Sequence, residues 1–518
     1  MKNRKISIGK IYKWLNLSFK NSIIIIMGVL LGVLSLCSLF FTTYISQNTN
    51  EHVTYKIGNP LILIVLLIII LALLFMYDRK YRIDKINTKK IFFALICYTI
   101  ITGIGVIFLV RGVPVGDQAL VSNIADQFNA HNFSSLLRGG YLFVYPYQLG
   151  LISLLQLLYR FFGKSQYVVL QVINVGAVLV SQYFLYKITD ISFKNKKVNN
   201  TLLLLLFGCL PLIMYVVFVY GTLVSLCLGL AAIWAELKYF EDGRYRYFLV
   251  AVLAICLAVL IKSNSLIILV AMVIMLFMNI VKEKKPAKFL LVILLILAVV
   301  LSGDILNAIY ENRSGIIISK GAPSVAWVAM GLKDGPRAPG WYNAYALPKK
   351  KDDYSTKEVT ELAQASIKKS VAGFVENPSY AISFFGQKFA SQWNDPSYQS
   401  IWVGSVMLRS GELSKIGNSL YNNDNGRVYN SLLSFMKLYQ SLIFISAFGF
   451  ILLSWRKIKY HQLFLVLVVI GGFLFHMAWE AKGEYIMPYF VMLIPLAAVG
   501  VVYALDYINK KTEENTKY

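Results

Sequence analysis

Long apolar runs alternate with polar segments along most of the chain. Each run has about twenty residues, which is enough for a helix to cross a hydrocarbon core of about 30 Å. A membrane β-barrel would instead show shorter segments of alternating hydrophobicity, so the pattern predicts an all-α polytopic membrane protein. We expect twelve membrane spans, near residues 22–44, 60–77, 91–110, 166–186, 201–220, 221–240, 247–262, 264–281, 288–304, 433–454, 462–480 and 485–507.

The apolar segment 145–162 does not fit this alternation. If it crossed the membrane completely, the basic segment 194–197 and every later basic loop would lie on the opposite side from the basic N-terminus. A segment that dips into the membrane, or that lies along its surface, removes this conflict with the charge pattern. We therefore predict that residues 145–162 form a re-entrant or interfacial segment.

Basic residues dominate the polar segments. The chain carries 51 Lys and Arg against 26 Asp and Glu, in a composition that is 57% hydrophobic and 15% charged. Basic loops mark the cytoplasmic side of a membrane protein, so this charge predicts a cell-membrane protein with both termini in the cytoplasm. It also favours contact with anionic membrane lipids rather than with nucleic acid. Of the 51 basic residues, 29 lie in segments 1–21, 78–90, 187–197, 238–246, 282–288, 456–459 and 510–517.

Cysteine and histidine give no sign of a metal centre. Cysteine inside an apolar run behaves as a small buried hydrophobe, and neither a disulfide framework nor a zinc spacing is present. His476, with Glu480 and Glu484 nearby, is weak support for a metal site, because such a site needs two or three ligands at a defined spacing. We expect no metal and no cofactor. The cysteines, all within apolar runs, are Cys37, Cys97, Cys209, Cys227 and Cys256.

Two long polar segments both face the outside in this arrangement. We expect residues 111–144 to form an interfacial first external loop and residues 305–432 to form an external, mainly helical domain. The halves of the chain show no similarity, although a secondary transporter would tend to have internal repeats. The chain then divides into an N-terminal membrane module 1–304, the external domain 305–432, and C-terminal membrane helices with a cytoplasmic tail, 433–518.

Helix-start signals support a folded external domain. Ser355 and Glu358 have the spacing of a capping box, which predicts a helix that runs to about residue 375. Asn377 followed by Pro378 predicts the start of a second helix, because Asn is a good N-cap and Pro is favoured at the first helical position. Both helices would lie outside the membrane.

Asp117 is the first candidate for chemistry. It begins the stretch "GDQALVSNIADQF", in which Val121, Ala125 and Phe128 share one helical face and predict an interfacial amphipathic helix. The plain interpretation is that Asp117 is the N-cap of this helix. The functional interpretation is a carboxylate held at the membrane surface as a general base for a hydroxyl or amine nucleophile.

Aromatic and basic residues on the same side have two interpretations as well. Tyr145 and Tyr147, in "YLFVYPYQLG", are typical of an interfacial aromatic belt, and they could equally form a platform for a sugar. Lys262 lies in the short outer turn "KSNS" between two spans. It could simply extend its amine to the interface, or it could bind a lipid phosphate beside Ser263 and Asn264. The segment "HMAWEAKGEYIMPYF" brings further polar groups to this interface.

Taken together, these motifs resemble a known superfamily. "GDQ" after a membrane span, "YPYQLG" further along, the "KSNS" turn and "KGEYIMPYF" occur in an order similar to that of GT-C membrane glycosyltransferases. The resemblance is closest to bacterial protein-mannosyltransferase-like and aminoarabinose-transferase-like members, and the external segment looks like a Firmicutes branch. It covers most of the chain after residue 91, and it implies a GT-C-like bundle of about twelve spans.

The resemblance implies roles for individual residues. The family's catalytic Asp in the first external loop corresponds to Asp117, and the family's donor-phosphate lysine corresponds to Lys262. Two departures are Gln118, where many members have an acid, and Glu484, where many have Arg, so that a phosphate contact could shift to Lys482. The expected substrate-binding residues are Lys262, Arg138, Tyr145, Tyr147, Gln148, Trp393, Glu480, Lys482 and Tyr485.

The resemblance therefore predicts an inverting glycosyltransferase that uses a polyprenyl-phosphate-linked sugar. Its acceptor would be an envelope polymer or a protein on the outer face of the cytoplasmic membrane. Trp393, in "SQWNDPS", could contact sugar together with Asn394 and Asp395, or it could belong to a structural Asx-Pro turn. Two other functions stay open, namely a flippase for a lipid-linked glycan and a non-enzymatic envelope-assembly protein. Replacing Asp117 by Asn separates an enzyme from a scaffold.

Overall fold

The structure is a computed structural model that describes residues 8–46, 51–345, 355–408, 415–422 and 426–515. The two ends of the chain, which belong to the basic segments 1–21 and 510–517, lie partly outside these residues. The same is true of three short stretches of the segment 305–432.

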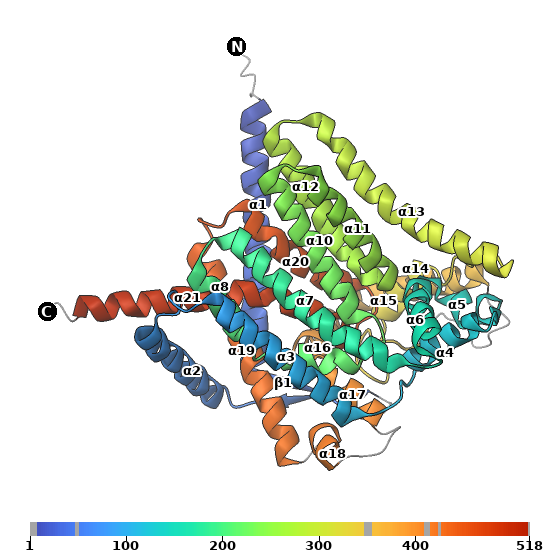
Figure 1. Ribbon diagram of the computed structural model, residues 1–518, viewed down its shortest axis with the longest axis horizontal. Helices are drawn as coiled ribbons and strands as arrows, with labels where there is room; N and C mark the ends of the chain where they lie inside the picture. Colours follow the sequence, from blue (N-terminus) through green and yellow to red (C-terminus); the bar gives the residue numbers. More distant parts are fainter. Residues whose placement is uncertain (1–7, 47–50, 346–354, 409–414, 423–425, 516–518) are drawn as a thin grey trace.

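The described chain is an all-α polytopic membrane protein, as the sequence predicts. Ten of its helices are long and apolar enough to cross a membrane. They pack side by side at varied tilts, and α2 and α13 lie at the edge of the bundle (Figure 1). These ten helices are α1 (Ile8–Phe40), α2 (Pro60–Tyr81), α3 (Thr88–Val110), α7 (Tyr167–Phe193), α10 (Thr222–Asp242), α12 (Leu266–Glu283), α13 (Phe289–Ser314), α19 (Arg427–Ser454), α20 (Phe464–Ala478) and α21 (Met487–Asn515).

The two remaining expected spans have less regular counterparts. The helix α11 (Tyr245–Ile261) is apolar but has only 17 residues, and it packs closely against α10. The span expected near 201–220 is a pair formed by α8 (Lys196–Leu206) and α9 (Leu210–Met214), with a bend of 54° between its two parts. Pro211 stands at the start of α9, where its missing N–H costs no hydrogen bond.

A sharp bend marks the segment that the charge pattern singles out. The short helix α5 (Tyr141–Val144) is followed by α6 (Leu149–Phe162), and the helical segments on the two sides of Tyr145 are bent by 103°. A turn of this size sends the chain back over itself, which suits a re-entrant or interfacial segment. That α6 does not cross the membrane stays a prediction.

The helix α4 (Asp117–Asn129) is amphipathic, but its apolar face meets protein rather than lipid. Val121, Ala125 and Phe128 are fully buried, and they join a cluster that includes Leu151 and Leu155 of α6. The predicted amphipathic helix is therefore confirmed, and its location at the membrane interface stays a prediction. Burial against α6 fixes the position of α4, and with it the position of Asp117.

A small β-hairpin follows the first helix, and its first strand takes the last four residues of the span expected at 22–44. α1 ends at Phe40, and β1 (Phe41–Ile45) pairs with β2 (Val53–Ile57) in antiparallel register, with Phe41 opposite Ile57. The strands are rich in β-branched and aromatic residues, which favour extended structure. The connection between them carries Glu51, which is buried.

The segment after α13 is mainly helical, and both predicted helix starts are confirmed. Ser355 caps α15, where its side chain accepts a hydrogen bond from the Glu358 N–H, and Asn377 accepts one from the Tyr380 N–H at the start of α16. The helix α13 continues past the predicted boundary at residue 304 to Ser314, and the boundary itself stays a prediction. The helices of this segment are α14 (Ser324–Gly331), α15 (Thr356–Glu376), α16 (Pro378–Trp393), α17 (Ser400–Leu408) and α18 (Lys415–Tyr421).

These elements gather at one end of the bundle. In Figure 1, α4, α5, α6, α14 and α15 lie at the right of the view, away from the N-terminus at the top and the C-terminus at the left. Segments that are far apart in the sequence thus meet at the end that carries the candidate residues.

Candidate active site

Two adjoining cavities lie where these segments meet. The first has a volume of about 350 Å³ and is lined by Asp117, and the second has a volume of about 410 Å³ and is lined by Lys262. We call them the Asp117 cavity and the Lys262 cavity. Their common wall is formed by Tyr147, Tyr220, Trp327, Glu480 and Tyr485. A molecule that passes this wall would contact both cavities.

Asp117 is the first residue of α4, not its N-cap. The N-cap is Gly116, whose φ of 59° and ψ of −134° define a backbone conformation that side chains other than glycine's rarely allow, and no side-chain cap is formed. The interpretation of Asp117 as a simple N-cap is therefore wrong. Its carboxylate is instead directed into the cavity, at the helix end whose dipole favours negative charge.

The surroundings of Asp117 raise its pKa. The carboxylate is accessible from the cavity, but the protein around it removes most of the bulk water, and this desolvation is the largest effect. Lys482 lowers the pKa through its charge, and the Tyr220 hydroxyl lowers it further, whereas the charges of Glu484 and Glu51 raise it. The net result is a carboxylate with a pKa above 3.8, which makes it a better proton acceptor than a free Asp.

Gln118, which stands where the resemblance would favour an acid, has a structural role. Its side chain is buried, and its Oε1 accepts a hydrogen bond of 2.8 Å from the Val219 N–H. This bond ties the start of α4 to the residue that precedes Tyr220. A carboxylate could accept the same bond, so the amide retains the position without adding a second charge beside Asp117.

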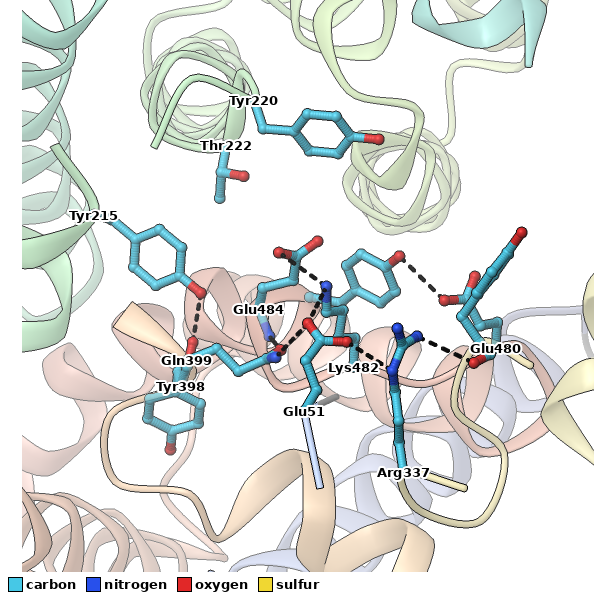
Figure 2. Close-up of polar contacts among 12 residues, drawn as sticks. Glu51, Tyr215, Tyr220, Thr222, Arg337, Tyr398, Gln399, Glu480, Lys482 and Glu484 are labelled. Carbon is cyan, nitrogen blue, oxygen red and sulfur yellow. Dashed lines mark hydrogen bonds and ion pairs between the residues drawn. The ribbon is translucent and has the colours of Figure 1, made fainter. Parts of the chain in front are cut away.

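Tyr220 connects the two candidate residues. Its hydroxyl lies near the Asp117 carboxylate, whose pKa it lowers, and it accepts a hydrogen bond of 2.6 Å from Gln148 Nε2. Its ring centroid lies 4.9 Å from the Lys262 amine. One side chain therefore contacts both Asp117 and Lys262. Figure 2 shows Tyr220 above the charged groups of the Asp117 cavity.

Lys262 follows the last residue of α11 and precedes the single turn η4 (Ser263–Ser265). Its Nζ donates a hydrogen bond of 2.9 Å to Thr222 Oγ1, and it also lies 5.8 Å from the ring centroids of Phe218 and Tyr485. Within the described residues Lys262 forms no ion pair. Its charge is therefore oriented by aromatic rings and a hydroxyl, without neutralisation by a bonded acid.

A glycine allows α6 to approach this turn. A Cβ atom on Gly150 would lie 2.0 Å from the Leu260 carbonyl oxygen, so no other residue fits there without movement of the backbone. The close contact places the start of α6, with Gln148, beside the end of α11, with Lys262. The packing of two helices thus sets the distance between two of the predicted substrate-binding residues.

Four charged groups form one wall of the Asp117 cavity. Glu51 accepts contacts from Lys482 Nζ at 2.9 Å and from Arg337 Nε at 3.1 Å, and Glu484 lies 3.9 Å from Lys482 (Figure 2). Gln399 joins the network, because its Oε1 accepts from the Glu484 N–H at 3.0 Å. Burial opposes the charge on Lys482, but Glu484 and Glu51 outweigh that effect and raise its pKa. Lys482 is therefore a paired cation.

Glu480 is the least ionised acid of this site. It is buried in the wall between the cavities, and desolvation raises its pKa to about 8, although Lys482 acts in the opposite direction. Near neutral pH this carboxyl group is mostly protonated, so it can donate a hydrogen bond to a ligand hydroxyl. Tyr485 Oη approaches Glu480 Oε1 at 3.5 Å from the same wall.

A buried lysine holds the segment that carries Glu480 and Lys482. Lys388 of α16 is fully buried, and its amine donates to the carbonyl oxygens of Gly331 at 2.5 Å and of Met477 and Trp479 at 2.9 Å. Burial lowers its pKa to about 7. The carbonyls belong to the ends of α14 and α20, where the helix dipole favours a cation.

Aromatic rings line the entrance between the cavities. Tyr145 lies 4.9 Å from Tyr141, 5.9 Å from Trp327 and 6.1 Å from Tyr147, measured between ring centroids. Tyr147 also contacts Trp327 at 6.3 Å. These rings come from α5, the turn after it and α14, and together they offer flat apolar faces with hydroxyl edges, which suit a sugar ring.

A known family matches part of this architecture. The family model for dolichyl-phosphate-mannose-protein mannosyltransferase matches residues 151–302, from α6 to α13. The match supports a membrane glycosyltransferase of the GT-C type. The matched range includes Tyr220 and Lys262, whereas Asp117 and the segment with Glu480 lie outside it. No curated protein sequence matches the chain.

Most of the predicted site residues line the two cavities, but two do not. Arg138 is exposed on the loop before α5 and lines neither cavity. Trp393 is fully buried against Phe473 and Tyr489, away from both. The predicted residues that line a cavity are Asp117, Tyr145, Tyr147, Gln148, Lys262, Glu480, Lys482 and Tyr485.

The surroundings of Trp393 favour its structural interpretation. Asp395 accepts hydrogen bonds from the N–H groups of Ser397 at 2.9 Å and Gln399 at 2.7 Å, which is the pattern of an Asx turn. Desolvation raises the pKa of Asp395 to about 6 in this buried turn. The turn orients Gln399 toward Glu484, so it supports the cavity wall from behind.

Several cavity residues were not predicted from the sequence. Glu51 and Arg337 come from connections that show no motif, and their role becomes visible only through the ion pairs described above. Tyr220, in "VVFVYGT", could have been noticed as a tyrosine at the external end of a span. The other unpredicted polar and aromatic residues of the Asp117 cavity are Tyr141, Phe218, Trp327, Tyr342 and Trp402. Within the described chain, no three His, Cys, Asp or Glu side chains are grouped to hold a metal ion.

Proposed function

We propose that this protein transfers a sugar from a polyprenyl-phosphate donor to a cell-envelope acceptor, with inversion at the anomeric carbon. The observation that carries the proposal is the pair of adjoining cavities, with Asp117 in one and Lys262 in the other. Tyr220 contacts both residues across the common wall. A sugar phosphate placed across this wall would have its phosphate beside Lys262 and its anomeric carbon near Asp117.

Lys262 suits the donor phosphate better than Lys482 does. Lys482 already pairs with Glu51 and Glu484, so a phosphate there would have to compete with two carboxylates. In the described residues the direct partners of the Lys262 amine are a hydroxyl and aromatic rings, and Glu484 acts on it only from beyond ion-pair distance, which leaves its charge for an anion. It also lies in a turn between two apolar helices, a position from which a polyprenyl chain could extend into lipid. The matched family's description names a lipid-phosphate sugar donor as well.

The proposed reaction is a single displacement. The acceptor hydroxyl or amine attacks the anomeric carbon from the face opposite the phosphate, and its proton passes to the Asp117 carboxylate. A new glycosidic bond forms while the bond between the anomeric carbon and the phosphate oxygen breaks. Polyprenyl phosphate leaves with the electron pair, and Lys262 stabilises its added negative charge. Atoms and charge balance without a further reactant.

The remaining wall residues would position the sugar. Glu480, protonated near neutral pH, can donate a hydrogen bond to a sugar hydroxyl, and Tyr145, Tyr147 and Trp327 can stack on the ring. Such positioning supplies much of the rate when the leaving group is already good.

The basic segments support a location on the outer face of the cytoplasmic membrane. If they face the cytoplasm, both termini are cytoplasmic, and the end of the bundle that carries the two cavities faces outward. The acceptor would then be an envelope polymer or a protein that reaches this face. Membrane lipids would surround the bundle whichever of these acceptors is used.

The test is transfer by the full-length protein in liposomes. Polyprenyl phosphate with a radiolabelled sugar serves as donor, and an envelope extract serves as acceptor. We expect release of polyprenyl phosphate that depends on Asp117 and stops with Asp117→Asn. The matched control is Asp304→Asn, at an exposed acid of α13 that lines neither cavity. Equal release by wild type and Asp117→Asn would contradict the proposal.

A further inference from the structure

A third cavity lies at the other end of α4, apart from the site described above. It has a volume of about 440 Å³ and lies between the end of α4, the last turns of α6 and the end of α13. The α-helical rise puts it roughly 18 Å along α4 from Asp117. Its lining residues that matter here are Asp126, Gln156, Arg160, Lys164 and Arg313.

The cations of this cavity exceed its acids. Arg160, Lys164 and Arg313 form no ion pair within the described residues. The one acid, Asp126, accepts hydrogen bonds from the Ser165 N–H at 3.1 Å and from Ser165 Oγ at 2.5 Å, so both of its oxygens are in use. His131 also lines the cavity and adds no negative charge. The cavity therefore has an excess of positive charge that side chains of the protein do not neutralise.

One of these cations is held in a fixed position. The Arg313 guanidinium lies 5.7 Å from the Phe133 ring centroid and 5.1 Å from that of Tyr310, and its Nη1 approaches Gln156 Oε1 at 3.4 Å. Gln156 is itself held by the Tyr310 hydroxyl, which donates to it at 2.5 Å. An Arg oriented in this way can present its remaining N–H groups to a phosphate without further loss of freedom.

Exposed apolar side chains adjoin the same cations. Phe161 and Phe162, directly after Arg160, are 74% and 61% exposed, and Leu157 on the preceding turn is 53% exposed. Apolar side chains of this size are expected to insert into lipid when they lie at the surface of a membrane protein. Arg160 and Lys164 would then lie at the depth of the lipid headgroups.

The geometry points to a binding site for the phosphate headgroup of an anionic phospholipid in this cavity. Phe161 and Phe162 would contact its acyl chains, while Arg160, Lys164 and Arg313 bind the phosphate. The headgroup joins α4, α6 and α13, which meet here. The site stands independently of the proposed glycosyl transfer.

The test uses photoactivatable lipids and the full-length protein in phosphatidylcholine liposomes. Phosphatidylglycerol and phosphatidylcholine analogues carry a diazirine on the acyl chain, and mass spectrometry maps the labelled peptides. We expect phosphatidylglycerol to label the stretch Leu157–Phe162 at least about fivefold more than phosphatidylcholine, since each surface cation contributes about that factor. The triple variant Arg160→Gln/Lys164→Gln/Arg313→Gln should lower phosphatidylglycerol labelling to the phosphatidylcholine level.

The control removes equal charge elsewhere. Lys357, Lys368 and Lys369 are exposed on α15, and replacing all three by Gln should leave the labelling unchanged. If the triple variant at the cavity unfolds, the single change Lys164→Gln in an exposed turn replaces it, with an expected loss of about fivefold. Equal labelling by the two lipids in the wild type, or no loss in the cavity variants, would overturn the proposal. So would complete competition by an excess of soluble glycerol phosphate, which would assign the cavity to a soluble ligand.

Discussion

The Asp117 cavity and the Lys262 cavity share a wall but differ in their charge. The Asp117 cavity contains acids and bases in contact, with Glu51 between Arg337 and Lys482. The Lys262 cavity contains a cation that lacks an ion pair in the described chain, surrounded by aromatic rings and small polar groups. The charges of the Asp117 cavity are therefore largely neutralised by ion pairs, whereas Lys262 lacks a paired anion within the described chain.

This difference suggests how one site could separate two tasks. In the proposed reaction, a donor phosphate would bind most favourably beside Lys262, because no carboxylate has to be displaced there. A proton acceptor gains from the Asp117 cavity, where desolvation raises the pKa of the carboxylate while Lys482 keeps it from rising further. Tyr220 lies beside both residues and would fix the distance between the phosphate site at Lys262 and the proton acceptor Asp117. The predictions below test this division.

The largest effect is expected for Asp117→Asn. The amide cannot accept the acceptor's proton, and loss of a general base typically lowers turnover by about 10²–10⁴-fold. Donor binding should change by less than about threefold, because the Lys262 cavity is unaltered. Single-turnover release of polyprenyl phosphate, together with a donor Kd, measures both quantities. A large loss of donor affinity with normal turnover would reverse the assignment of the cavities.

Lys262→Met should mainly weaken donor binding. A hydrogen bond to a charged group contributes about 1.5–3 kcal/mol, so the donor Kd should rise by roughly 10- to 100-fold. The matched variant Lys482→Met should raise the donor Kd much less, because that lysine is already paired with Glu51 and Glu484. If Lys482→Met has the larger effect on the donor Kd, the phosphate lies in the Asp117 cavity.

The pH dependence should distinguish the two acids. The rate should fall at low pH as Asp117 becomes protonated, at a pKa above 3.8, because only the carboxylate form accepts a proton. It should also fall as pH rises through about 8, because Glu480 then loses its proton and becomes an anion beside the donor phosphate. Glu480→Gln should retain the rate at pH 7 within about threefold and lose the alkaline decline. An unchanged alkaline decline in this variant would show that another group causes it.

The smallest functional effect is expected for Trp393→Phe. The side chain is buried outside both cavities, so the change should lower stability by about 1–2 kcal/mol and leave kcat and the donor Kd unaltered. Thermal unfolding and the transfer assay measure these two properties separately. A rise in the donor or acceptor KM at unchanged stability would return Trp393 to the list of substrate contacts.

The sequence predicts which membrane helices and turns carry the site better than it predicts which side chains of the connecting loops line it. Hydrophobic runs and basic loops place Asp117, Lys262 and the segment with Glu480 at one end of the bundle, because membrane crossings restrict where each segment can lie. Arg337 and Glu51 follow from no such rule. Their pairing depends on how a hairpin after α1 and a loop after α14 fold over the cavity, which no local pattern encodes.

Trp393 is a residue that was predicted to contact substrate but lies outside both cavities. An aromatic residue followed by Asn and Asp is typical of sugar contacts, but it is equally typical of a helix end followed by an Asx turn. Only the packing of Trp393 against Tyr489 and Phe473 separates these alternatives. The two interpretations of Asp117 were also separated only by the structure, in which the N-cap of α4 is Gly116.

The most direct test of the division between the cavities is a structure of the protein with an unreactive polyprenyl-phosphonate sugar bound. The account predicts the phosphonate within hydrogen-bonding distance of Lys262 Nζ, and the sugar ring past Tyr220 and Tyr485 with its anomeric carbon facing Asp117. A phosphonate bound to Lys482 in the Asp117 cavity, or a sugar that points away from Asp117, would contradict it.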